Sequence, residues 1–190
     1  MAGMKLIGIA GTNGSGKDTV GHMLAEKHKF LFVSVSDLLR AECRRRGLPV
    51  EREHLRAISA EWRREGGLGV LIDKAMEEYE RRGAHYAGMA VASVRNPGEN
   101  ERVHELGGTM VWVDADSRVR YDRIQSANRG RGTEDTKTYE QFLAEEEAEM
   151  HPSGDAATLN MSAVKDLCDR TILNEGTEAN LEVQITKLVT

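Results

Sequence analysis

Cysteines and long apolar runs are both scarce in this sequence, and each shortage excludes a class of protein. Cys43 and Cys168 are the only two cysteines among 190 residues, and their spacing fits no metal motif. We expect two free thiols in a reducing cytoplasm, with a single disulfide as the less favoured alternative. No apolar run approaches the roughly 20 residues of a transmembrane helix. Residues 1–5 lead directly into the first apolar segment, so we expect neither a signal peptide nor a membrane partner.

Basic residues are also in the minority. Aspartate and glutamate number 31 against 26 lysines and arginines, which gives a net charge of −5. Binding to nucleic acid usually needs a basic face, so we expect no nucleic-acid partner. The arginines are nevertheless clustered, at residues 44–46, 63–64, 81–82 and 118–131. Local clusters of arginine in an acidic protein favour a small anionic ligand.

The most informative motif is Gly-Thr-Asn-Gly-Ser-Gly-Lys-Asp-Thr at residues 11–19. An apolar run precedes it and a helical pattern follows it. Glycines allow successive backbone N–H groups to converge on a phosphate, and the following helix N-terminus adds partial positive charge. We expect Lys17 to reach the terminal phosphates and the Thr19 hydroxyl to bind Mg²⁺. The predicted phosphate-binding residues are Thr12, Asn13, Gly14, Ser15, Gly16, Lys17, Asp18 and Thr19.

The spacing of this motif is more specific than a generic phosphate loop. It fits Gly-x-x-x-x-Gly-Lys, but Asp18 holds the next position, where a serine or threonine is usual, and the hydroxyl follows one residue later at Thr19. This variant resembles the P-loop of nucleoside monophosphate kinases of the adenylate kinase group. The resemblance implies that ATP is the phosphate donor and that Mg²⁺ is the cofactor.

The order of predicted elements indicates the fold class. Apolar segments suited to strands lie at residues 6–10, 30–35, 86–94, 109–114 and 170–174, with helical patterns between them. This alternation implies an α/β fold with a parallel sheet and helices on both faces. We predict one domain over residues 1–190 with a three-layer P-loop kinase fold and strand order 2-3-1-4-5. A helical acceptor-binding insert is expected near residues 37–82, a short lid near residues 123–135, and a solvated acidic helix face at residues 145–149.

Polar residues that follow the second and third strands are the predicted acceptor site, because ligands of such sheets lie at the carboxyl ends of the strands. Residues 36–40 resemble the start of the monophosphate-binding helix of adenylate kinases. The resemblance implies that Arg40 contacts an acceptor phosphate and that Arg95, just past the third strand, does the same. We assign substrate binding to Ser36, Asp37, Arg40 and Arg95.

The segment from Arg123 to Arg131 resembles the lid entrance of the same kinases. This implies that Arg123, Arg129 and Arg131 act with Lys17 on the charge of the transferring phosphoryl group. One feature departs from the family pattern, which usually has an aspartate near the end of the third strand that helps to hold Mg²⁺. Ala92 and Ser93 occupy that neighbourhood here. The carboxylates that could replace it are Asp18, Asp37 and Asp114.

These features predict ATP-dependent phosphoryl transfer to a small nucleotide, a nucleoside or deoxynucleoside monophosphate, by a monomer or homodimer. Two alternatives stay open. A dephospho-CoA kinase-like enzyme would transfer to a hydroxyl and would need a base, for which Asp37 is the candidate. Residues 171–177 resemble the fifth strand and following loop of those kinases as well. A nucleotide-binding switch or regulatory ATPase is the alternative from another class.

Overall fold

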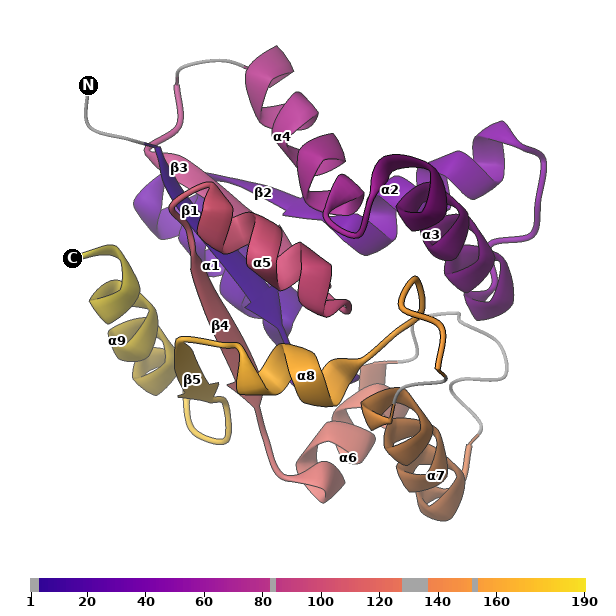
Figure 1. Cartoon of the computed structure of the whole chain (residues 1–190). Coiled ribbons are helices and arrows are strands. Elements are labelled where there is room, and N and C mark those ends of the chain that lie inside the picture. The colour runs from indigo at the N-terminus through magenta and orange to yellow at the C-terminus, as the bar shows by residue number, and fades with distance from the viewer. Residues whose placement is uncertain (1–3, 83–84, 128–136, 152–153) are drawn as a thin grey trace.

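The computed structural model describes residues 4–82, 85–127, 137–151 and 154–190. Within this part of the chain, five parallel strands form one sheet in the order β2-β3-β1-β4-β5, which confirms the predicted order (Figure 1). The strands are β1 (Lys5–Ala10), β2 (Phe30–Ser34), β3 (Gly88–Ala92), β4 (Thr109–Asp114) and β5 (Arg170–Leu173). The described helices are α1 (Lys17–His28), α2 (Val35–Arg45), α3 (Arg52–Gly66), α4 (Val70–Arg82), α5 (Pro97–Glu105), α6 (Ser117–Ala127), α7 (Tyr139–Met150), α8 (Met161–Asp166) and α9 (Glu178–Val189).

Helices cover both faces of the sheet because the central strands β1 and β3 bury both of their faces. Successive side chains of a strand point to opposite sides, and in β1 they join two different apolar clusters. Leu6 and Ala10 pack with residues of α2, α3, α4, α5 and α8. Ile7 and Ile9 pack with residues of α1 and α9 on the other face. The result is the predicted three-layer arrangement (Figure 1).

The strand register places the ends of the central strands together at one edge of the sheet. Ile9 of β1 lies beside Ala92 of β3, and Ser34 of β2 lies beside Ala92 on its other side. Ala10 pairs with Trp112 of β4. The loop after β1, the start of α2 and the loop after β3 therefore leave the sheet side by side.

The ends of β2 and β3 at this edge differ from the prediction. The strand β2 ends at Ser34, because Val35 begins α2 and packs its side chain into the core from the helix. Ser36 therefore lies inside the first helical turn. The strand β3 ends at Ala92, because Ser93 adopts a φ of 69° and turns the chain out of the sheet. Left-handed backbone angles are uncommon outside glycine and often occur at functional sites.

Candidate functional site

The loop between β1 and α1 has the backbone that its glycines predict. Gly14 and Gly16 have φ angles of 80° and 92°, which disfavour any residue with a side chain. Gly14 also packs tightly, since a Cβ there would lie 2.6 Å from the carbonyl oxygen of Arg120. Gly16 is the N-cap of α1, so the loop ends at the positive end of that helix.

Lys17 is the first residue of α1 and is largely enclosed by the loop that precedes it. The residue is 8% exposed, and its Nζ donates to the Thr12 carbonyl at 3.4 Å. The ammonium group is thus held within the phosphate-binding loop. Burial of a charge is unfavourable without partners of opposite charge or polarity, so an enclosed lysine in this position is well suited to bind an anion.

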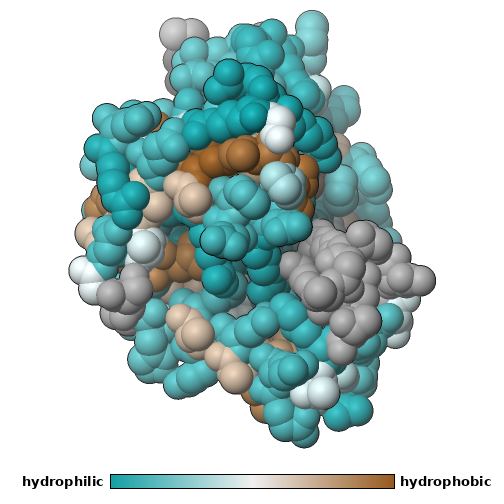
Figure 2. Space-filling view, turned by 90° about the vertical axis from the view of Figure 1, so that its right-hand side faces the viewer, coloured by the Kyte–Doolittle hydropathy of each residue, from teal (hydrophilic) through white to brown (hydrophobic). Residues whose placement is uncertain are grey.

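An open cleft of about 560 Å³ brings the predicted phosphate site and the predicted acceptor site together. Its described lining consists of Asn13, Gly14, Gly16, Lys17, Asp18, Thr19, Ser36, Arg40, Arg52, Ser93 and Arg95. Thr12 and Ser15 are buried parts of the same loop and do not line the cleft. Figure 2 shows the face of the molecule on which α3 and α7 lie, where hydrophilic residues cover most of the surface.

Three arginines reach this cleft from three different elements. Arg40 lies on α2, Arg95 follows β3, and Arg52 is the first residue of α3. The sequence predicts Arg40 and Arg95 at this site but not Arg52. Arg52 is separated from every recognisable motif, and its position at the site depends on how α3 folds back toward the loop.

Asp18 is the carboxylate in this cleft whose surroundings fit a magnesium ion. Its Oδ1 is buried, and within the described part of the chain no hydrogen-bond donor reaches it. The other two candidates already have cationic partners. Asp37 accepts from Nη1 of Arg40 at 2.7 Å and its side chain is 70% exposed, whereas Asp114 lies 3.4 Å from Nζ of Lys165. Carboxylate and hydroxyl oxygens are the protein ligands that Mg²⁺ prefers, and Asp18 with Thr19 supplies both.

The loop that carries Arg95 is fixed by a buried ion pair. Glu99 accepts from the main-chain N–H groups of Arg95 and Asn96 through Oε2, at 2.8 and 3.2 Å. Its Oε1 accepts from Nε and Nη2 of Arg63 at 2.9 and 2.6 Å. The side chains of Arg63 and Glu99 are 2% and 0% exposed. A fully bonded buried pair holds its neighbours in one geometry, so the main chain of Arg95 is rigidly placed.

The acidic segment 145–149 is not the solvated helix face that the sequence predicts. Glu149 is buried against Arg95 and Arg56, at 3.0 and 2.9 Å. Glu145 accepts from Nη1 of Arg52 at 3.1 Å. The prediction was wrong because arginines of α3 and the arginine after β3 reach one face of α7, and only the folded chain brings them there.

Burial and the neighbouring arginines together determine the direction in which the pKa of Glu149 shifts. Burial by itself would raise that pKa. The positive charges of Arg95, Arg52 and Arg56 outweigh this effect and hold the pKa of Glu149 below 4.5, its ordinary value. Glu149 is therefore an ionised carboxylate at neutral pH, directly behind two of the arginines that line the cleft.

Arg123 lies behind the phosphate-binding loop and not among the residues that line the cleft. Its Nη2 donates to the Asn174 carbonyl at 2.6 Å, and Nδ2 of Asn174 donates to the Ser15 carbonyl at 2.9 Å. These bonds link α6 and the end of β5 to the loop. Arg129 and Arg131 lie outside the described residues, as does most of the predicted lid. The catalytic roles of these three arginines stay predictions.

Comparison with known proteins shows which family this chain belongs to. The family model AAA_18, described as an AAA domain, matches residues 7–150. A UPF0200 protein of Pyrobaculum aerophilum is 31% identical over 144 residues, which cover 74% of each chain. A UPF0200 protein of Pyrococcus horikoshii is 28% identical over 197 residues, which cover 97% of this chain and 95% of the relative.

Solved structures confirm the fold class. Shikimate kinase from Bacteroides thetaiotaomicron superposes with a TM-score of 0.61 and 14% identity, over 97% of this chain and 96% of the other. The protein TT1252 from Thermus thermophilus superposes with a TM-score of 0.60 and 21% identity, over 98% and 97%. In the described part of the chain, no helix has the length and apolar character that crossing a bilayer requires. The architecture is thus P-loop kinase-like, and the chain belongs to the AAA_18 family and to the UPF0200 proteins.

Proposed function

We propose that this protein transfers a phosphoryl group from ATP to a small anionic acceptor, a nucleoside or deoxynucleoside monophosphate in the first instance. One observation carries the proposal: a single cleft contains both a phosphate-binding loop and the arginines Arg40, Arg52 and Arg95. A loop that only binds or hydrolyses a nucleotide needs no second set of anion-binding groups. A kinase whose acceptor carries a phosphate needs both sets.

The residues of the cleft divide into two roles. The backbone N–H groups of residues 14–19 and the ammonium of Lys17 would bind the donor phosphates and neutralise the charge that develops during transfer. Arg40 and Arg95, with Ser36 beside them, would hold the acceptor. A phosphate acceptor is already ionised at neutral pH, so this reaction requires no general base. Asp37 is not among the cleft-lining residues, and it would contribute to the acceptor site through its bond with Arg40.

Asp18 and Thr19 would hold the magnesium ion that accompanies ATP. When bound there, such an ion would supply positive charge that offsets the charge of the donor phosphates. The unpartnered Oδ1 of Asp18 supports this assignment, because a buried carboxylate oxygen is unfavourable without a hydrogen-bond donor or a cation beside it. Arg123, Arg129 and Arg131 would complete the site from the lid at residues 123–135, and residues 37–82 would form the acceptor-binding insert of a single cytoplasmic domain.

The choice of a nucleoside monophosphate rests on the late hydroxyl in the phosphate loop and on the arginines that follow β2 and β3. Both resemble adenylate kinases. The solved shikimate kinase has the same fold, and its name indicates a different acceptor. The fold therefore supports kinase chemistry in general, and the loop spacing supports the monophosphate acceptor.

Transfer to a hydroxyl, as in dephospho-CoA kinases, is the second candidate. A specific observation favours it: Asp18 lines the cleft and makes no hydrogen bond through its buried Oδ1 in the described part of the chain, so its carboxylate could accept a hydroxyl proton. Asp18→Asn should then abolish transfer to a hydroxyl acceptor even at saturating Mg²⁺. If Asp18 only helps to hold the ion, a higher Mg²⁺ concentration should recover part of the activity.

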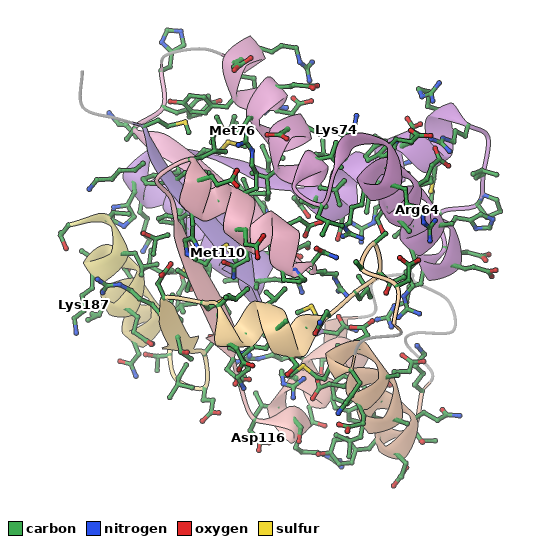
Figure 3. All side chains as sticks on the ribbon, viewed as in Figure 1. Arg64, Lys74, Met76, Met110, Asp116 and Lys187 are labelled. Atoms are coloured by element: carbon green, nitrogen blue, oxygen red, sulfur yellow. The ribbon has the colours of Figure 1, made fainter. Side chains whose placement is uncertain are left out.

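An ADP-release assay over nucleoside monophosphates, deoxynucleoside monophosphates and dephospho-CoA tests the proposal. We expect one acceptor class to stimulate ADP release and Lys17→Ala to abolish the stimulated rate. Lys187→Ala is the matched control, because Lys187 lies on α9, on the other side of the sheet from α3 (Figure 3). ATP hydrolysis without stimulation by any acceptor would refute both kinase readings and favour a nucleotide-dependent switch.

A further inference from the structure

Two arginines of the cleft are already bound by a carboxylate of the chain itself. Oε2 of Glu149 accepts from Nη1 of Arg95 at 3.0 Å, and its Oε1 lies 3.7 Å from Nη1 of Arg52. The same Oε1 accepts from Nη2 of Arg56 at 2.9 Å. The Glu149 side chain is 8% exposed, so these contacts are largely shielded from water.

This carboxylate lies next to the cleft and not on a remote surface. A shallow, open hollow adjoins the cleft and shares Asn13 and Arg52 with it. The acidic residues of α7, Glu145, Glu146 and Glu149, line that hollow. The helices α3 and α7, joined by these ion pairs, lie on the side of the molecule where Figure 3 labels Arg64.

The contacts make the arginine set close to neutral. Guanidinium groups bind carboxylate and phosphate through the same N–H pairs. An acceptor phosphate that reaches Arg52 and Arg95 from the cleft therefore meets cations that are already paired. Glu149 also repels the acceptor phosphate. The two anions would share one arginine, and water screens their repulsion only in part because Glu149 is buried.

The anchoring of Arg95 allows its side chain to change partners. The main-chain N–H of Arg95 is bonded to Glu99, independently of the bond between its guanidinium and Glu149. The backbone can thus stay fixed when the side chain turns. Arg56 differs, because it contacts Glu149 but does not line the cleft.

From this arrangement we infer that Glu149 is a built-in competitor of the acceptor, which holds Arg95 and Arg52 until an acceptor phosphate takes them over. Arg56 retains Glu149 when the exchange occurs. The inference rests on the proposed function and adds a consequence: binding of the acceptor anion weakens the contact between α3 and α7. Glu149 therefore sets the affinity and the charge requirement of the acceptor site.

If Glu149 had a purely orienting role, its removal would change the anion affinity in the opposite direction. If the carboxylate only orients Arg95 and Arg52, its removal loosens them and weakens anion binding. If it competes, its removal takes one carboxylate away from Arg95 and from Arg52, which keeps its bond to Glu145, and anion binding becomes stronger. The direction of the change in anion affinity therefore separates the two roles.

The test is a titration with inorganic phosphate, read from the arginine Nε–H signals in NMR spectra, with MgADP present to occupy the phosphate loop. We expect Glu149→Gln to bind phosphate on the order of tenfold more tightly than the parent protein, a typical coupling between neighbouring charges. Arg56→Gln should bind it severalfold more weakly, because Glu149 then pairs more strongly with Arg95. Glu147→Gln on the same helix is the control and should bind as the parent does, since the Glu147 side chain is 74% exposed.

Unchanged or weaker phosphate binding by Glu149→Gln, or no response of the Arg95 signal in any variant, would overturn the inference. Should Glu149→Gln fail to fold, Arg56→Gln decides, because the Arg56 side chain is 52% exposed and its replacement leaves the core intact. Stronger binding by Arg56→Gln would also overturn it. The proposed function is judged separately: failure of MgADP to bind, or of any acceptor to stimulate ADP release, counts against that proposal and not against the sign of these changes.

Discussion

Replacing Glu99 with glutamine should destabilise the protein strongly, because one amide cannot make the bonds of this carboxylate. Glu99 accepts four hydrogen bonds, two from the Arg63 side chain and two from main-chain N–H groups. Glutamine has a single acceptor oxygen, and its NH₂ group would face donors on the other side. The Arg63 charge, 2% exposed, would then be left without its anionic partner.

The size of the effect follows from this loss. Removing one partner of a buried ion pair costs about 3–5 kcal/mol. At a urea m-value of about 2 kcal/mol/M, the midpoint of unfolding should fall by about 2 M. The measurement is urea unfolding followed by circular dichroism. Glu101→Gln, at an exposed position of the same helix, should shift the free energy of unfolding by less than about 0.5 kcal/mol.

A second substitution tests the cause of the loss. If the unpaired charge of Arg63 is the main penalty, Arg63→Met in the Glu99→Gln background should recover part of the stability. A midpoint for Glu99→Gln within about 0.3 M of the parent value, at an unchanged m-value, would refute the reasoning. A double variant less stable than Glu99→Gln would show that packing, and not charge, dominates at this position.

Three further predictions concern the loop and α7. Lys17→Ala should weaken ATP binding about hundredfold, as measured by calorimetry, because it removes a charged hydrogen-bond donor to phosphate; unchanged binding would remove the loop from the site. Asp18→Asn should raise the Mg²⁺ concentration needed for ATP binding, and a requirement equal to the parent's would exclude Asp18 from the ion site. The lowered pKa of Glu149 means that its stabilising effect is present above about pH 4.5 and is lost as the pH falls through the folded-state value. Glu149→Gln should therefore reduce the drop in the urea midpoint between about pH 6 and pH 3, whereas Glu147→Gln should leave that drop unchanged.

The phosphate loop could be predicted from sequence because its determinants are local. Gly14, Gly16 and Lys17 lie within four residues of one another, and the backbone geometry follows from the residue types. The strand order could be predicted because alternating strands and helices, together with the resemblance to kinases, leave few topologies. Both depend on neighbours in the chain or on a regular pattern.

The charged network behind the cleft could not be predicted in the same way. Arg56 and Glu149 are 93 residues apart, and no motif connects them. A run of glutamates on a helix is usually solvated, so burial of Glu149 becomes visible only when α7 is placed against α3. The left-handed φ of Ser93 could not be predicted for a different reason. Serine rarely adopts such an angle, and no glycine at this position signals it in the sequence.

The bond between Asn174 and Ser15 has a consequence for how the protein is made. The ribosome makes the phosphate loop well before Asn174, which supports the loop and lies 159 positions after Ser15 in the chain. The central strand β1 likewise waits for β3 and β4, its two neighbours in the sheet. A nascent chain that lacks the last strand therefore carries the loop sequence without its support. Nucleotide would then assist folding only after residue 174 has been made, so a truncation before residue 174 should lose the benefit of added ATP.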